Sequence, residues 1–338
     1  MFDRVFIVAE LSANHNGSID LAIETIRAAK RAGADAIKIQ SFTPDTITLD
    51  SKKEDFLIKG TIWQDQYLFD LYKKAYTPFE WHSKLFEVAK EEGLICFSSP
   101  FDKSSVDMLE SLDSPYYKIA SPEITDIPLI RYVASKGKPV FVSTGIANRK
   151  DIELCLSTIK STGNNQIVLL KCVSSYPASI EDSNLIMIQH YKKEFNVLTG
   201  LSDHTMSNLT SICAVSLGAC IIEKHLILNR NLGGPDAEFS LDEDEFNSLV
   251  KSIRLTEAAI GKESYELKES QIRSKRFCRS LYIVKDVKFG DTITEENVRS
   301  IRPGYGLHPK HFESILGEKF SGSFEKGTSL KFSHILNK

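Results

Sequence analysis

Two histidines occupy equivalent places in the segment 197–225. An apolar run at 197–201 leads into His204, and a second at 220–222 leads into His225. Apolar residues between the runs recur at helical spacing, so the segment is predicted to be strand, helix, strand. The carboxyl ends of parallel strands form the ligand-binding edge of α/β folds, and imidazoles from neighbouring strands can share one divalent metal ion. A histidine beside a strand can equally be an ordinary core or surface residue, so the rest of the chain must decide.

Polar side chains also stand at the ends of the other predicted strands. Lysine with serine and threonine suits a phosphate group, while carboxylates beside them suit proton transfer or the binding of sugar hydroxyls. A lysine at a strand end can also simply extend its head group into solvent. The residues in question are Glu10, Lys38, Gln40, Ser98, Ser99, Lys118, Ser121, Glu123, Ser143, Thr144, Ser174, Tyr176, Ser202, Glu223 and Lys224. Together they predict a pocket lined for an anion.

Eight strand-like runs alternate with eight helix-like runs over about 260 residues, which is the size and rhythm of a (β/α)8 barrel. The strands read as nearly continuous apolar runs, as expected of a parallel sheet covered on both faces. An open doubly wound sheet is the alternative, but it often carries a GxGxxG motif that is missing here. The strands are predicted at 5–9, 35–39, 94–100, 116–123, 139–145, 167–177, 197–201 and 220–222.

The composition indicates an ordinary globular protein with a second, smaller module. Hydrophobic residues make up 42% and charged residues 26%, and the net charge of −3 argues against bulk nucleic-acid binding. Six cysteines without a CxxC pair are expected to be reduced. No run approaches the length of a membrane span, and a cytoplasmic location is expected. The predicted domains are a barrel at 1–260, a polar linker at 261–276 and a small β-rich domain at 277–338.

Several motifs in order carry a family resemblance. They are AELSANHNG (9–17), KIQ (38–40), SSPFD (98–102), YKIASPE (117–123), STG (143–145), SYP (175–177), GLSDHT (200–205), EKH (223–225) and GGPDAEFSL (233–241). Together they resemble the sialic acid synthases over almost the whole barrel. RPGYGL (302–307) looks like the antifreeze-protein-like (SAF) domain of that family. Within it, ELSANHNG and the stretch 60–82 resemble the pseudaminic acid synthase branch. Ser174 departs from the asparagine that is common in the family.

The resemblance implies a condensation of phosphoenolpyruvate with an N-acetylated amino sugar in its open-chain aldehyde form. For the pseudaminic branch the sugar would be 2,4-diacetamido-2,4,6-trideoxy-L-altrose. His204 and His225 would ligate a divalent metal ion, Mn²⁺ or Mg²⁺, and Glu123 would handle the attacking water. The residues expected to hold phosphoenolpyruvate are Lys38, Ser99, Lys118, Ser121, Ser143, Ser174 and Ser202. Those expected on the sugar are Glu10, Gln40, Tyr176, Asp236 and Arg302. Arg302 would come from the partner subunit of a domain-swapped homodimer.

Other readings stay open from the sequence alone. The sugar could be N-acetylmannosamine or a 2,4-diacetamido-mannose derivative, which would make the product N-acetylneuraminic or legionaminic acid. A different metal-dependent barrel aldolase or epimerase, or a binding protein without turnover, is a more distant alternative. The long segment 42–77, with Trp63 and Tyr67, is expected over the pocket mouth, where it would recognise the apolar 6-deoxy end of the sugar. It could also be an ordinary surface loop.

Overall fold

The computed structural model describes residues 2–336, so Met1 and residues 337–338 of the predicted terminal domain lie outside the described part. The chain divides into two compact units, Met1–Gly261 and Lys262–Lys338. The first unit carries every predicted site residue except Arg302. No helix within residues 2–336 is both long enough and apolar enough to cross a membrane.

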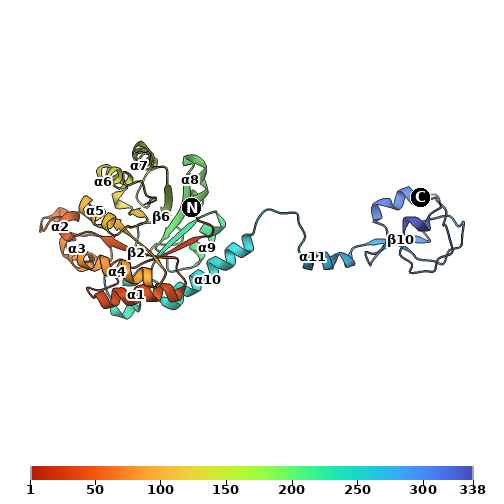
Figure 1. Ribbon diagram of the computed structural model, residues 1–338, viewed down its shortest axis with the longest axis horizontal. Coiled ribbons are helices and arrows are strands. Elements are labelled where there is room, and N and C mark those ends of the chain that lie inside the picture. Colours follow the sequence, from red (N-terminus) through yellow and green to blue (C-terminus); the bar gives the residue numbers. More distant parts are fainter. Residues whose placement is uncertain (1, 337–338) are drawn as a thin grey trace. The chain divides into compact units, whose positions relative to one another are not determined.

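The first unit is a closed barrel of eight parallel strands in sequential order, as predicted (Figure 1). Closure is made by β1 and β8, which pair in parallel from Phe6↔Ile221 to Glu10↔His225. This closure excludes the open doubly wound sheet. The strands are β1 Phe6–Glu10, β2 Ala36–Ser41, β3 Ile95–Pro100, β4 Tyr117–Ile119, β5 Val140–Ser143, β6 Ile167–Cys172, β7 Leu198–Asp203 and β8 Ile221–His225.

A helix follows each strand and packs on the outside of the barrel. Local signals set their ends: Ser18 caps α1 through a bond from the Leu21 amide, and Gly33 ends the helix with a φ of 92°, which favours glycine. The helices are α1 Ile19–Ala32, α4 Phe79–Glu91, α5 Lys103–Ser111, α6 Ile127–Ala134, α7 Arg149–Ser161, α8 Met187–Phe195, α9 Leu209–Ser216 and α10 Glu243–Ile260. Between β2 and α4 lie the short helices α2 Pro44–Ile47 and α3 Leu68–Ala75 and the 3-10 turn η1 Glu54–Phe56.

The barrel interior is apolar at its amino end and polar at its carboxyl end. Buried Phe6, Phe97 and Phe141 belong to the cluster that fills the amino end, with Ala36 and Ile221 beside them. Because successive side chains of a strand alternate between its two faces, the inward series of β2 continues from Ala36 to Lys38 and Gln40. The series of β8 continues from Ile221 to Glu223 and His225. The apolar cluster therefore fills the barrel beneath a ring of polar side chains at its carboxyl end.

The second unit has a small core of its own. Its two regular strands, β9 Ser280–Ile283 and β10 Val298–Ile301, pair antiparallel. The rest of its described residues form isolated bridges, turns, short 3-10 segments and two short helices, α11 Glu269–Ser274 and α12 Phe312–Ile315. Its core contains Leu281, Ile283, Val298 and Phe320, all fully buried. Arg302 follows β10 directly and is exposed.

Candidate active site

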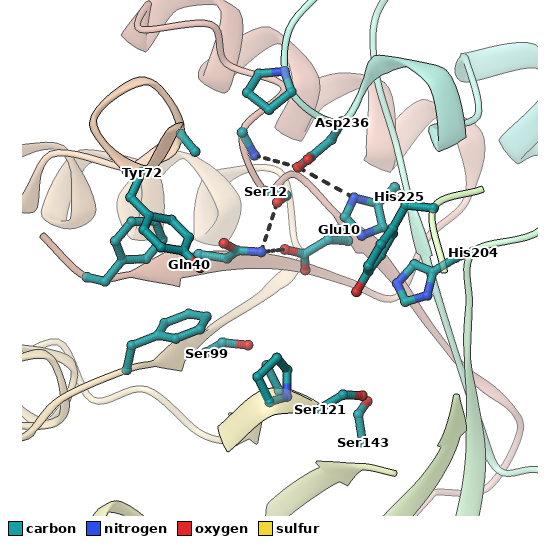
Figure 2. Close-up of a pocket in the computed structure, with 18 of the residues that line it drawn as sticks. Glu10, Ser12, Gln40, Tyr72, Ser99, Ser121, Ser143, His204, His225 and Asp236 are labelled. Atoms are coloured by element: carbon teal, nitrogen blue, oxygen red, sulfur yellow. Dashed lines mark hydrogen bonds and ion pairs between the residues drawn. The ribbon is translucent and has the colours of Figure 1, made fainter. Parts of the chain in front are cut away.

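A cavity of about 390 Å³ opens at the carboxyl end of the barrel strands (Figure 2). The structure brings thirteen of the predicted site residues to its lining: Glu10, Lys38, Gln40, Ser99, Lys118, Ser121, Glu123, Ser143, Tyr176, Ser202, His204, His225 and Asp236. Ser174 does not line the cavity, and Arg302 belongs to the other unit. Glu223, one of the predicted polar strand ends, also lines the cavity, whereas Ser98, Thr144 and Lys224 do not. Residues that sequence reasoning did not assign to the pocket line it too, including Ser12, Cys172 and Phe239.

Two lysines and two glutamates form a buried network of charges at the base of the cavity. Lys38 Nζ lies 2.5 Å from Glu10 Oε2, and Lys118 Nζ donates to Glu223 Oε1 at 3.2 Å. Ser202 Oγ donates to the same Glu223 oxygen at 2.9 Å, and Lys38 Nζ is 3.9 Å from it. All four charged side chains are nearly inaccessible to solvent. Each ammonium group is therefore paired with a carboxylate, as the burial of a charge requires.

The two glutamates of this network differ in acidity. Burial raises the pKa of Glu10 to about 7, although Lys38 opposes the shift. Burial would also raise the pKa of Glu223, but the ammonium groups of Lys118 and Lys38 outweigh it and lower the pKa to about 2. Glu223 is therefore the permanent anion that holds the lysines, whereas Glu10 can gain or lose a proton near neutral pH. The sequence signal for Glu223 was its place between Ile221 and His225 on the inward face of β8.

Serine hydroxyls extend the lysine network across the cavity floor. Lys38 Nζ donates to Ser99 Oγ at 3.3 Å, and Ser121 Oγ accepts from the amide of Gly145 at 3.0 Å. Ser143 Oγ is buried and has no hydrogen-bond partner among the described residues. Gly145 is needed here, because a Cβ would lie 2.1 Å from Ser174 Oγ and 2.8 Å from Ser121 Oγ. Ammonium groups beside hydroxyl groups form the donor set that a phosphate ester requires.

The two histidines predicted to hold a metal ion face each other, with ring centroids 5.4 Å apart. His204 Nδ1 lies 2.9 Å from the carbonyl oxygen of Val173, to which it can donate, and this leaves Nε2 as the ligand atom. Burial and the positive charge of His204 and Lys38 hold the pKa of His225 well below its usual value, so this ring is neutral. Burial lowers the pKa of His204, but Cys172, the Val173 carbonyl and the Glu223 carboxylate together raise it above its usual value. Protons would therefore compete with a metal ion at this ring.

These two rings fit a divalent ion. Metal–nitrogen bonds of about 2.0–2.1 Å, added to the ring radii, span the observed centroid separation. His225 Nδ1 is buried without a hydrogen-bond partner among the described residues and lies 4.0 Å from Asp236 Oδ2. No cluster of three or more histidine, cysteine, aspartate or glutamate side chains in residues 2–336 is arranged to hold a metal. Two protein ligands would leave most coordination positions open for substrate, as a catalytic ion requires.

A row of polar side chains leads from the histidines across the cavity (Figure 2). Gln40 Nε2 donates to Ser12 Oγ at 2.8 Å and to Glu10 Oε1 at 3.4 Å. Asp236 Oδ2 accepts from the amide of Ala13 at 3.2 Å. These amide and carboxylate groups can bind the successive hydroxyl and amide groups of an extended sugar.

The segment 42–77 forms an apolar wall of the cavity. The wall residues are Phe42, Ile47, Ile58, Trp63, Leu68, Leu71 and Tyr72. Trp63 Nε1 donates to the carbonyl oxygen of Pro235 at 2.8 Å, and its ring lies 5.5 Å from that of Tyr176. In Figure 2 Tyr72 lies at the end of the cavity opposite His204, with Gln40 and Glu10 between them. The segment thus contributes to the cavity lining, although Tyr67 is not among the lining residues. Recognition of a sugar by this segment stays a prediction.

Glu123 reaches the cavity from the 3-10 turn η2 Pro122–Thr125, which follows β4. Its Oε2 is buried without a hydrogen-bond partner among residues 2–336. Burial raises the pKa of this carboxyl to about 7. A carboxyl group with a pKa near the working pH suits a general base or acid.

If Glu123 acts as the base, its ionised form must increase as the pH rises through about 7. We therefore expect kcat to rise about tenfold per pH unit below pH 6 and to level off above pH 8. Glu123→Gln should lower kcat at pH 8 by about 10²–10⁴-fold and remove this limb. Steady-state kinetics from pH 5.5 to 9 measure both effects, with Glu153→Gln on the exposed face of α7 as the control. If Glu123→Gln still showed the rise of kcat between pH 5.5 and 7, that rise would belong to the titration of another group.

Comparisons with known proteins agree with the residue pattern. Residues 25–265 match the model of the NeuB family, and residues 279–336 match the SAF domain. A pseudaminic acid synthase of Campylobacter jejuni is 48% identical over 330 residues, covering 98% of this chain and 96% of its own. One of Helicobacter pylori is 45% identical, with 97% of each chain covered. The crystal structure of an N-acetylneuraminic acid synthetase from Leptospira borgpetersenii is 31% identical, with a TM-score of 0.72 over 80% of this chain and 90% of its own.

Proposed function

Since this chain belongs to the NeuB family and ends in a SAF domain, we propose that it is a pseudaminic acid synthase. Such a synthase is a transferase that condenses phosphoenolpyruvate with 2,4-diacetamido-2,4,6-trideoxy-L-altrose and releases phosphate. The observation that supports the proposal is that one cavity combines three groups of residues: buried lysines and serines at its base, a histidine pair and an apolar wall. The basal group, called the lysine–serine floor below, consists of Lys38, Lys118, Ser99, Ser121, Ser143 and Ser202.

The lysine–serine floor would bind phosphoenolpyruvate. Its phosphate and carboxylate would take over the contacts that Lys38 and Lys118 make with Glu10 and Glu223, and Ser143 Oγ would gain the partner it lacks. Charge-assisted hydrogen bonds in a buried site are short and strong, which offsets the cost of removing a multiply charged ester from water. Holding the methylene carbon against the aldehyde also removes much of the entropic barrier, on the order of 7 kcal/mol or more in ideal cases.

The chemistry then needs three changes of bonding. The methylene carbon of phosphoenolpyruvate bonds to the aldehyde carbon, water adds to the carbon that bears the phosphate, and the bond from that carbon to the phosphate oxygen breaks. Glu123 is the group we assign to the water, and Glu10 would bind sugar hydroxyls and exchange a proton with them. A divalent ion held by His204 and His225, such as Mn²⁺ or Mg²⁺, would supply Lewis-acid polarisation of the aldehyde.

The apolar wall supports a 6-deoxy sugar as the acceptor. With the aldehyde placed at the histidines, the far end of a six-carbon chain points toward Tyr72 and its neighbours (Figure 2). Leu68, Leu71 and Ile58 offer only apolar side chains there, while Thr61 and Tyr72 on the same wall carry hydroxyl groups. A methyl group packed against the three aliphatic side chains gains from burial, whereas a hydroxyl placed against them would lose its water without a partner on those residues.

A substrate panel tests the proposed function. The purified enzyme is offered phosphoenolpyruvate with N-acetylmannosamine, the 2,4-diacetamido-mannose and gluco derivatives, or the 2,4-diacetamido altro sugar, and phosphate release is followed. We expect release with the altro sugar at a kcat/KM at least 100-fold above the others. Preference for N-acetylmannosamine or for the mannose derivative would instead make the chain a sialic or legionaminic acid synthase. Turnover of the sugar without phosphoenolpyruvate would indicate an aldolase or epimerase.

Arg302 is proposed to bind the N-acetyl group of the sugar from the partner subunit of a domain-swapped homodimer. The described cavity lining contains no arginine that could donate to an amide carbonyl. Arg302→Ala should raise the KM for the sugar about 10- to 100-fold, the value of a charge-assisted hydrogen bond, and leave the KM for phosphoenolpyruvate unchanged.

Mixing variants tests the swap. When Arg302→Ala is unfolded and refolded with an inactive barrel variant, random pairing leaves roughly a quarter of the sites with both intact parts. At a sugar concentration well below the wild-type KM, where Arg302→Ala alone is nearly inactive, activity should therefore return to about that fraction of the wild-type level. If the mixture stays as inactive as its components, Arg302 does not act across subunits. Arg299→Ala, on β10 nearby, serves as the control for a change of surface charge alone.

A further inference from the structure

A second buried ion pair lies directly behind the histidines, outside the cavity. Lys224 Nζ is 2.7 Å from Asp203 Oδ2, with side-chain exposures of 0% and 2%. Asp203 precedes His204 and Lys224 precedes His225, so strand alternation turns this pair outward where the histidines turn inward. The outward direction is confirmed by hydrogen bonds to Asp203 Oδ2 from the hydroxyl groups of Thr210 and Ser211 on α9. The substrates cannot touch this pair, and no step of the reaction uses it.

The strand ladder alone does not fix His204. The β6–β7 register ends at Cys172↔Ser202, and the β7–β8 register ends at Asp203↔Lys224, so His204 lies beyond both. His225, by contrast, is still paired with Glu10 of β1. His225 therefore belongs to a regular strand, whereas His204 lies one residue past the last paired residue of β7.

Beyond the ladder, the turn at His204 is held by a bond from the Ala178 amide to the His204 carbonyl oxygen at 3.0 Å and by the ion pair. Asp203 Oδ1 accepts from the amide of Thr205 at 2.9 Å and so closes the turn on which His204 stands. The Lys224 ammonium group also donates to Thr205 Oγ1 at 3.4 Å and to the carbonyl oxygen of Ser207 at 3.2 Å. A side chain of β8 thus contacts the side chains of Asp203 and Thr205, which flank His204, and the backbone carbonyl of Ser207 beyond them.

We propose that the Asp203–Lys224 pair is the positioning device that sets the separation of His204 and His225 and thereby the affinity for the divalent ion. The inference depends on the metal site of the proposed function. Metal bonds tolerate errors of only a few tenths of an ångström, and loss of the groups that orient metal ligands typically weakens binding 10- to 100-fold. In this protein the orienting contact would act through the backbone rather than through the imidazole rings.

The test compares metal and phosphoenolpyruvate binding in Lys224→Met and Asp203→Asn. We expect the dissociation constant for Mn²⁺, measured by calorimetry on the full chain, to rise at least tenfold in both. Binding of phosphoenolpyruvate in the presence of a chelator should stay within twofold of wild type, because Lys38 and Lys118 face the other side of the barrel wall. A merely structural pair would lower the melting temperature and leave both affinities unchanged.

A matched control is the Asp35–Arg254 pair at the amino end of the barrel, with a separation of 2.6 Å. Asp35 also accepts from the amide of Ile7, so Asp35→Asn removes a carboxylate that ties strands together, far from the histidines. It should lower the melting temperature without changing Mn²⁺ affinity. If Asp203→Asn, like Asp35→Asn, lowers the melting temperature but leaves the Mn²⁺ dissociation constant unchanged, the proposal is wrong.

Two further variants keep the proposal testable if a single change at the pair prevents folding. The double variant Asp203→Asn/Lys224→Met removes both buried charges while preserving shape, and it should fold but still bind Mn²⁺ at least tenfold more weakly. Thr210→Val removes one hydrogen bond to Asp203 and should weaken Mn²⁺ binding by a smaller factor. Wild-type Mn²⁺ affinity in both would overturn the proposal. Turnover by the wild-type enzyme under strict chelation would also overturn it, while leaving the synthase function intact.

Discussion

His204→Ala is expected to lower kcat/KM by at least 10³-fold and to abolish Mn²⁺ binding, with the fold retained. The substitution would remove one of the two proposed nitrogen ligands, and the ring of His225 alone would not hold a divalent ion at micromolar concentration. The fold should survive because the ring lies on the cavity wall and no strand pairing depends on it. The lost hydrogen bond to the Val173 carbonyl should cost about 1 kcal/mol of stability.

Kinetics and calorimetry of the same sample measure these effects, and circular dichroism checks the fold. His190→Ala is the control, since His190 is an exposed histidine that pairs with Glu194 on α8. It should leave both activity and Mn²⁺ affinity unchanged. Full metal-dependent turnover by His204→Ala would remove His204 from the site and, with it, the proposed arrangement of the aldehyde.

Lys118→Met is expected to raise the KM for phosphoenolpyruvate about 100-fold. The substitution removes one ammonium group from the cavity floor and leaves the Glu223 carboxylate with less compensation, so the floor becomes more negative toward an anionic substrate. A charge-assisted hydrogen bond contributes about 1.5–3 kcal/mol, and repulsion by Glu223 adds to it. The KM for the sugar should change much less, because the sugar carries no charge.

The matching control is Lys138→Met, a lysine that pairs with Glu110 at 2.9 Å and is absent from the described cavity lining. A second variant, Lys118→Met/Glu223→Gln, removes the excess negative charge and should recover part of the lost affinity. An unchanged KM in Lys118→Met would exclude Lys118 from the phosphoenolpyruvate site.

Much of the barrel was predictable because each strand carries its own signal. The apolar runs and helical periodicities gave the order of eight strands and eight helices, and the structure confirms that order. Strand ends were less predictable. The strand predicted at 220–222 continues to His225, because the carboxyl end of a barrel interior is polar and the loss of apolar residues there does not end the strand. The run at 167–177 stops instead at Cys172.

The partners within the site could not be predicted from local patterns. Lys118 meets Glu223 across 105 residues, and no spacing in the sequence distinguishes this pair from other combinations of lysine and glutamate. The same holds for Trp63 and Pro235, which are joined through a backbone carbonyl. Ser174 was expected among the phosphoenolpyruvate residues and stays outside the cavity lining, although its hydroxyl lies against Gly145 beside Ser121. Only the closed barrel, which places all eight strand ends around one axis, determines these contacts.

The central claim is that one cavity holds a divalent ion on His204 and His225 opposite a phosphoenolpyruvate on Lys38 and Lys118. A crystal structure of the protein with MnCl₂ and phosphoenolpyruvate, recorded at the manganese absorption edge, tests it most directly. The predicted result is one anomalous peak within about 2.3 Å of a nitrogen of each ring, with the phosphate between the two lysines. A manganese peak elsewhere, or phosphoenolpyruvate bound away from both lysines, would contradict the account.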